Sequence, residues 1–295
     1  MFFFSFFFDT PPVARRGETS GEYWADTNPS FPPVRACLFD MDGLLLDTED
    51  LYTLCVNLVL DKYGRPPIPW SVKAKLQGRP GPAATKIFSD WAKLPISTEE
   101  YMAQLHVFHN QVFPTTKPLP GVVDLLAKLS HPDIENVHIA LATSSHKSNY
   151  ELKTAHLGYL LSKFPDDRRV LGDDARLQPG RGKPLPDIFL LALKTINDSL
   201  PAGEKPITPE ECLVFEDSVP GVEAGRRAGM RVVWVPHKKL KEEVAGREEE
   251  ILAGRAGEAG EVDMHQVGEI GDGWAEELTT LEAFPFKKYG IVVPS

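Results

Sequence analysis

The chain has 295 residues, of which 42% are hydrophobic and 25% charged, enough for a folded protein with a sizeable core. Its net charge of −10 is concentrated between residues 241 and 282, and no basic stretch indicates a nucleic-acid partner. No apolar run is long enough to span a membrane, and three cysteines without a pairing pattern are typical of reduced thiols. We therefore predict a cytoplasmic monomer that contacts neither membranes nor nucleic acids.

In the first third of the chain, an irregular tail and a short strand are followed by a region with the sequence pattern of helices. Residues 1–33 are rich in phenylalanine and proline without periodicity, which predicts a disordered tail, and a short apolar strand follows at 34–39. Residues 48–118 show only helical spacing, and Ser97 to Glu100 have the pattern of a capping box. The region 48–118 is therefore predicted to be an all-helical cap domain.

Strands and helices alternate from residue 119 onwards. Strand-like runs at 137–141, 170–171, 212–215 and 231–235 are separated by helical patterns, which predicts an α/β fold with a doubly wound parallel sheet, Rossmann-like in its core. This core comprises residues 34–47 and 119–240. Residues 241–273 are acidic and rich in glycine and alanine, so we predict a disordered insertion, whereas residues 274–295 regain apolar character and are expected to pack on the core.

Two carboxylates, Asp40 and Asp42, directly follow the first strand, and Gly43 marks the start of a loop. Because strand side chains alternate between faces, only a break in the strand lets both acids converge. They would meet at the carboxyl edge of the sheet, where ligands bind in open α/β folds. Two such close acids repel one another unless a cation neutralises them. The motif therefore predicts a Mg²⁺ site with one carboxylate as nucleophile and the other as proton carrier.

Three other structures produce a similar short motif. An EF-hand loop also begins with two acids one residue apart, but its glycine is sixth and a helix precedes it. A hairpin turn at Asp42 and Gly43 would be followed by alternating residues, which the three leucines after Gly43 are not. Acids that cap a helix are the third alternative, and Asp47 could have that role.

Polar side chains also follow the later strands. Thr143 comes just after the strand at 137–141, where its hydroxyl and the next helix start form an anion site or a plain helix cap. Lys183 precedes a helix and is either a phosphate-neutralising group or a solvated lysine; Pro184 excludes a Walker A loop. Glu216 and Asp217 end the strand at 212–215, and two further acids beside the first pair require a divalent cation.

The motifs together resemble those of the haloacid-dehalogenase-like (HAD) hydrolases. The likeness covers residues 34–240 and 274–290, and the helical insert resembles the C1 cap of that family. Within the family the motifs are most similar to those of pseudouridine-5′-phosphatases, and the sugar-phosphate phosphatases are nearly as close. The segments that carry the resemblance are Asp40-Met41-Asp42-Gly43, Ala142-Thr143-Ser144-Ser145, Gly182-Lys183-Pro184 and Glu216-Asp217-Ser218.

The resemblance implies a role for each matching residue. Asp40 would attack phosphorus to form an aspartyl-phosphate, and Asp42 would protonate the leaving oxygen and then activate water. Thr143 and Lys183 would hold the phosphoryl oxygens. Mg²⁺ would bind Asp40, the backbone carbonyl of Asp42 and Asp217. Glu216 would either bind the ion or contact its ligands without binding it. The expected substrate-binding residues are Ser144, Gly78, Arg79 and Tyr52, although Arg79 could equally be a solvated surface residue.

The resemblance predicts a Mg²⁺-dependent phosphatase for a small phosphomonoester, such as pseudouridine 5′-phosphate or a related nucleoside or sugar phosphate. Asp42 argues against a dehalogenase, which needs no acid there. A β-phosphoglucomutase-like mutase uses the same two aspartates, but the resemblance would then place a histidine near Tyr52. A non-catalytic binding protein of HAD descent is the second alternative.

Overall fold

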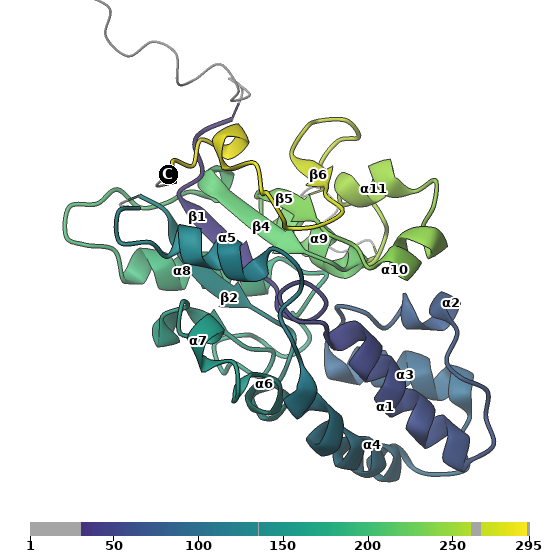
Figure 1. Ribbon diagram of the computed structural model, residues 1–295. Helices are drawn as coiled ribbons and strands as arrows, with labels where there is room; N and C mark the ends of the chain where they lie inside the picture. The colour runs from purple at the N-terminus through teal and green to yellow at the C-terminus, as the bar shows by residue number, and fades with distance from the viewer. Residues whose placement is uncertain (1–30, 135, 261–266, 294–295) are drawn as a thin grey trace, which may run out of the picture.

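The computed structural model describes residues 31–134, 136–260 and 267–293, which form a parallel sheet between helices with a helical lobe beside it (Figure 1). Within these ranges the sheet has six strands in the order β3-β2-β1-β4-β5-β6, and every neighbouring pair is parallel. The order reverses at the central β1, which is where open α/β sheets bind ligands. The strands are β1 (Ala36–Phe39), β2 (His138–Ala142), β3 (Arg169–Val170), β4 (Cys212–Glu216), β5 (Arg231–Trp234) and β6 (Ala275–Glu277).

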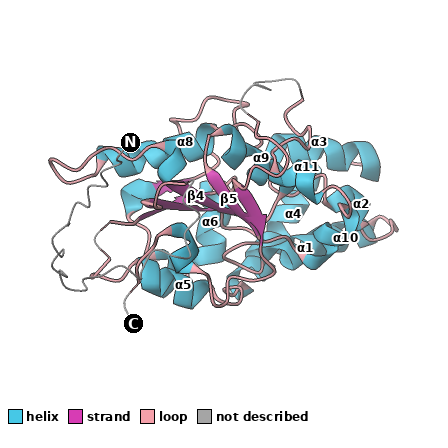
Figure 2. Cartoon of the chain, turned by 90° about the horizontal axis from the view of Figure 1, so that it is seen from above, coloured by secondary structure: helices cyan, strands magenta, loops and turns pink. Residues whose placement is uncertain are grey.

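Helices cover both faces of the sheet, as Figure 2 shows from above. Side chains of β1 alternate between the two layers: Cys37 and Phe39 belong to one core cluster, and Ala36 and Leu38 to the other. The predicted doubly wound α/β fold is thus confirmed. One layer contains α5 (Val122–Leu129), α6 (Lys147–Thr154) and α7 (Gly158–Leu161); the other contains α8 (Asp187–Asp198), α9 (Val219–Arg227), α10 (Lys238–Glu243) and α11 (Glu248–Leu252).

The predicted helical cap is inserted between β1 and α5 and packs around a third hydrophobic cluster that includes Cys55, Phe88 and Phe113. Its entry and exit are bonded together, because the Asp47 N–H donates to the Lys117 carbonyl at 3.0 Å. The exact domain boundaries stay a prediction. No helix in the described ranges is long and apolar enough to cross a membrane. The cap helices are α1 (Thr48–Lys62), α2 (Trp70–Lys73), α3 (Gly81–Ala92) and α4 (Thr98–Val112).

The prediction of disorder for residues 241–273 is wrong for the part that the structure describes, 241–260 and 267–273. This segment contains the second half of α10 and all of α11, and Ile251 is buried. Two kinds of contact fold it: sparse apolar residues pack against the sheet layer, and acids bind buried bases, as Asp272 does with Arg226. An acidic composition therefore does not leave the segment solvated. Residues 261–266 lie outside the described residues.

The two ends of the described chain pack on the core. Most of the predicted tail, residues 1–30, lies outside the described residues, but Phe31 packs edge-on against Trp274 with ring centroids 5.3 Å apart. After residue 274 the chain adds β6 to the sheet, a strand of three residues that follows glycine-rich sequence and that we did not predict. Phe284 and Tyr289 then join the main core cluster.

Ile251 tests whether the acidic segment is folded. Replacement of this buried side chain by alanine should leave a cavity and lower the free energy of unfolding by about 2–4 kcal/mol, measured by urea denaturation. The matched control is Ile270→Ala in the same segment, because Ile270 is 58% exposed and should change stability by less than about 0.5 kcal/mol. Equal effects of the two substitutions would contradict the packed arrangement.

Candidate active site

The first motif forms the loop that sequence reasoning predicted at the carboxyl end of β1. The Asp40 N–H still donates to the carbonyl of Phe215 in β4 at 3.0 Å, so Asp40 is held against the sheet. Gly43 then turns the chain with φ of 77°, and its N–H donates to the Thr48 hydroxyl at 3.0 Å. A side chain at Gly43 would overlap the carboxylate of Asp217, so only glycine brings this loop so close to the fourth motif.

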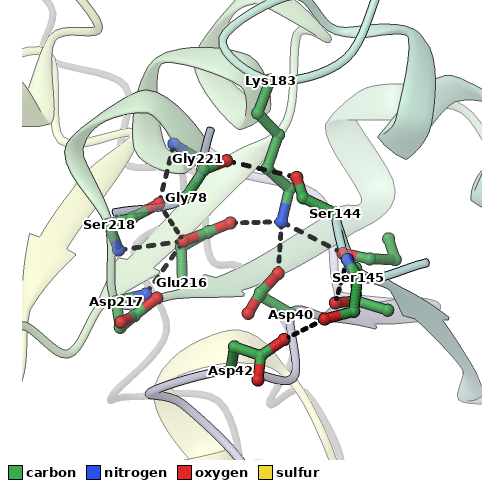
Figure 3. Close-up of polar contacts among 12 residues, drawn as sticks. Asp40, Asp42, Gly78, Ser144, Ser145, Lys183, Glu216, Asp217, Ser218 and Gly221 are labelled. Carbon is green, nitrogen blue, oxygen red and sulfur yellow. Dashed lines mark hydrogen bonds and ion pairs between the residues drawn. The ribbon is translucent and has the colours of Figure 1, made fainter. Parts of the chain in front are cut away.

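Lys183 lies at the centre of the site and joins three of the predicted motifs (Figure 3). Its fully buried ammonium group contacts Asp40 Oδ1, Glu216 Oε1 at 2.6 Å and the carbonyl of Ala142 at 3.1 Å. Opposite charges in this geometry hold both carboxylates in fixed positions. The structure therefore brings Lys183, Asp40 and Glu216 together, as the sequence predicted, and the solvated-lysine alternative is wrong.

Sequence reasoning missed a second buried lysine, Lys153 in α6. Its ammonium group lies 2.5 and 2.7 Å from the two carboxylate oxygens of Asp42, 2.6 Å from Ser145 Oγ and 3.1 Å from the Tyr52 hydroxyl. The Ser145 hydroxyl also donates to Asp42. Each of the two motif aspartates is thus paired with its own lysine. A lysine near the end of a polar helix carries no signal in the sequence that distinguishes it from a surface residue.

The acids that end β4 differ in their surroundings. Glu216 uses one oxygen for Lys183 and the other to accept bonds from the backbone N–H groups of Asp217 and Ser218, each at 3.0 Å. Because both of its oxygens are already engaged, Glu216 fits a positioning role better than that of a metal ligand. Asp217 instead accepts a bond from the cap residue Gln77, which precedes the predicted substrate-binding residues Gly78 and Arg79 and for which the sequence predicted no role of its own.

Burial and charge shift the pKa values of the acids in opposite directions. Burial raises the pKa of Asp40 to about 7, although Lys183 opposes the shift. Burial, and then Glu216, raise the pKa of Asp217 well above its usual range. Burial would also raise the pKa of Asp42, but the Lys153 charge and hydrogen bonds outweigh it and lower that pKa. Asp40 and Asp217 are therefore the acids whose negative charge is least compensated.

The charge balance of the site fits one divalent cation. Four carboxylates from the first and fourth motifs face two buried ammonium groups, so two negative charges remain without a partner among these motif groups. Within the described residues no three His, Cys, Asp or Glu side chains cluster as a ready-made metal site. The available ligands are two carboxylates, those of Asp40 and Asp217, and the backbone carbonyl of Asp42. Such hard oxygens suit Mg²⁺, which usually keeps several waters.

The predicted substrate-binding residues line a cavity of about 890 Å³ between the sheet edge and the cap, together with Asp40 and Asp42. Thr143 is fully buried, and its hydroxyl accepts from the Ser145 N–H at 3.1 Å. Ser144 donates to the Gly78 carbonyl at 3.2 Å and so connects the core with the cap loop. The Arg79 guanidinium pairs with Glu258, so it is not a solvated surface group. The substrate-binding roles stay predictions.

Comparison with known proteins identifies the family. Residues 34–229 match the haloacid dehalogenase-like hydrolase family, and the chain belongs to it. It is 42% identical over 258 residues to a Saccharomyces cerevisiae protein named "Probable pseudouridine-5'-phosphatase", which covers 88% of this chain and 98% of that one. It is 36% identical to "(DL)-glycerol-3-phosphatase 2" of Arabidopsis thaliana, over 69% of this chain and 80% of the other. The chain is therefore a phosphoric monoester hydrolase.

A solved structure supports the fold. The "putative beta-phosphoglucomutase from Thermotoga maritima" is 31% identical, with a TM-score of 0.50 over 74% of this chain and 97% of that chain. The HAD fold and its helical cap are thus shown by sequence and structure alike.

Gly43 tests the close approach of the first loop to Asp217. Gly43→Ala should lower kcat and destabilise the fold, because a methyl group adds a collision to the cost of a positive φ. Gly203→Ala is the matched control, since Gly203 has φ of 91° with open space around its Cα and should lose only about 1 kcal/mol. Phosphate release and urea denaturation measure the two effects. A Gly43→Ala enzyme as active as the Gly203→Ala enzyme would contradict this geometry.

Proposed function

We propose that the chain is a Mg²⁺-dependent phosphatase that hydrolyses a small phosphomonoester through an aspartyl-phosphate, with pseudouridine 5′-phosphate or a related nucleoside or sugar phosphate as substrate. The observation that carries the proposal is the pairing of Asp40 with buried Lys183 where the cavity meets the end of β1. An acid fixed there by a cation can face a phosphorus atom in the cavity while water is kept out by the cap.

Asp40 is the proposed nucleophile. One of its oxygens is held by Lys183, which leaves the other to attack phosphorus, and the ester P–O bond breaks as the new P–O bond forms. Charge spreads over the phosphoryl oxygens in this step, so the Lys183 ammonium and the Thr143 hydroxyl at the same edge stabilise it. Glu216 keeps Lys183 in place from the other side.

Asp42 is the proposed proton carrier. Because Lys153 lowers the pKa of Asp42, its carboxylate must first take up a proton, which the entry of the negatively charged phosphate favours. It gives this proton to the departing oxygen, and the resulting carboxylate then takes a proton from the water that attacks the aspartyl-phosphate. Lys153 and Ser145 hold the Asp42 carboxylate in one orientation. Mg²⁺, when held by Asp40, Asp217 and the Asp42 carbonyl, would neutralise negative charge on the phosphoryl group.

The cavity supports a leaving group larger than a simple alcohol. Its volume of about 890 Å³ exceeds what a phosphate needs, and the cap walls contribute apolar and aromatic side chains such as Phe88, Tyr101 and Leu105 beside polar ones. A ring can pack on these walls while its hydroxyl groups meet the polar core edge. Relatives named as a pseudouridine-5'-phosphatase and a glycerol-3-phosphatase agree with a small phosphomonoester.

Asp40→Asn tests the nucleophile. The substitution keeps the shape of the side chain but removes its charge, and we expect phosphate release from pseudouridine 5′-phosphate to fall by roughly a thousandfold or more. Asp50→Asn is the control, because Asp50 is an exposed acid at the start of α1 and its replacement should leave kcat unchanged. Full turnover by the Asp40→Asn enzyme would exclude the aspartyl-phosphate route.

The raised pKa values predict how Mg²⁺ binding depends on pH. Folded metal-free chains keep protons on Asp40 and Asp217 that unfolded chains release above about pH 4. Their stability therefore falls as the pH rises from about 4 through the raised pKa values, that of Asp40 being about 7. Because Mg²⁺ can bind only when these protons leave, the rise in Tm on adding Mg²⁺ should be larger at about pH 8 than at about pH 5.5. Asp217→Asn should abolish most of this rise. A larger rise at the lower pH would refute the assignment of the ligands.

The likeness to the Thermotoga maritima structure makes a phosphosugar mutase the second candidate. In the same assay, a mutase would convert a hexose 1-phosphate into its isomer without net release of inorganic phosphate. In a mutase, the resemblance would place a histidine near Tyr52. Here the tyrosine hydroxyl itself accepts a hydrogen bond from Lys153, close to Asp42, and the presence of tyrosine in this place favours hydrolysis.

A further inference from the structure

The cap loop carries an arginine whose charge is cancelled from outside the cap. Arg79 lines the cavity, and its guanidinium forms an ion pair with Glu258, which belongs to the acidic segment between β5 and β6. The Arg79 Nε also donates to the carbonyl of Lys75 at 2.8 Å. Both partners are mostly shielded, with side-chain exposures of 18% and 23%, so this pair is stronger than an ordinary surface salt bridge.

The position of Glu258 is fixed by buried charges behind it. The backbone N–H groups of Glu258 and Ala259 donate to the carboxylate of Glu223 in α9, at 3.0 and 3.1 Å. Glu223 is itself buried and pairs with the buried Arg227 at 2.9 Å. Because the backbone is bonded to this pair, Glu258 reaches the cap loop from a rigid support.

The lysines that line the cap half of the cavity also form ion pairs with acids. Lys73 lies 2.9 Å from Glu49, and Lys86 lies 2.7 Å from Asp90. Among the described lining residues, every lysine and arginine therefore has an acidic partner. Apart from the phosphate site at the sheet edge, the described lining offers a second anion no lysine or arginine without an acidic partner, although the Lys86–Asp90 pair is exposed, with side-chain exposures of 76% and 67%.

We propose that Glu258 determines specificity by neutralising Arg79, so that the enzyme accepts phosphomonoesters with an uncharged leaving group and discriminates against substrates with a second phosphate or carboxylate. This inference rests on the proposed phosphatase function. A second anion would have to enter a space in which Arg79, the one arginine among the described lining residues, is already paired. Displacing Glu258 would leave a shielded carboxylate without its partner.

Glu258→Gln tests the proposal, because it keeps the size of the side chain and removes its charge. The assay compares kcat/KM for glucose 1,6-bisphosphate with kcat/KM for glucose 1-phosphate in the full chain with Mg²⁺. The freed guanidinium can form a charge-assisted bond to the second phosphate, so the ratio of the two values should rise roughly tenfold or more in the variant. Glu250→Gln is the matched control, because Glu250 lies in the same segment, pairs with Arg247 and is half-exposed.

A double variant, Arg79→Gln with Glu258→Gln, assigns the effect to the arginine. It should lose the gain and return the ratio to within about twofold of the wild-type value. An unchanged ratio in a Glu258→Gln enzyme with wild-type Tm would overturn the proposal, as would a gain that persists in the double variant. Failure of the phosphatase function would look different, because neither sugar phosphate nor pseudouridine 5′-phosphate would then release phosphate in any variant.

Discussion

The structure of the site depends on the pairing of each motif aspartate with its own buried lysine. Asp40 with Lys183 and Asp42 with Lys153 are held in charged contacts that water does not screen. A buried ion pair is weak support for stability, because the desolvation cost of both groups offsets their attraction. Its effect is one of geometry: it gives two acids, two residues apart, separate and fixed orientations. The first acid faces the sheet edge and the second faces the helix that follows β2.

The pairing of charges also explains why separate helices and loops meet at the carboxyl end of β1. Lys183 reaches Asp40 from the loop before α8, and Lys153 reaches Asp42 from α6, so the connection after β2 and the connection after β3 each supply one cation to the site. Among the residues that the structure describes, no lysine pairs with Asp217, and burial raises its pKa instead. The divalent ion that the family uses would supply the charge that the protein leaves out at this point.

The sequence predicted the parts of the site that obey local rules. Acids and polar residues directly after apolar runs were placed correctly at one edge, because the carboxyl ends of parallel strands share that edge. Lys153 escaped prediction because it lies inside the polar helix α6, where the sequence does not distinguish it from a surface lysine. The acidic segment after residue 240 was misjudged for a related reason: composition describes a solvated chain, but Arg226 and the Glu223–Arg227 pair provide buried partners that only tertiary structure reveals. β6 was missed because three residues show no periodicity.

The cap joins the core through two neighbouring segments, at Asp47 and Lys117. Besides the backbone bond between them, the Lys117 N–H donates to the Asp47 carboxylate at 2.7 Å. The cap therefore begins and ends at one place beside β1, so the pairing of the strands in the sheet does not depend on the residues of the insert. The architecture separates two kinds of evolutionary change. Substitutions in the inserted lobe can alter which ester is admitted, while the strands that carry the reactive groups keep their register.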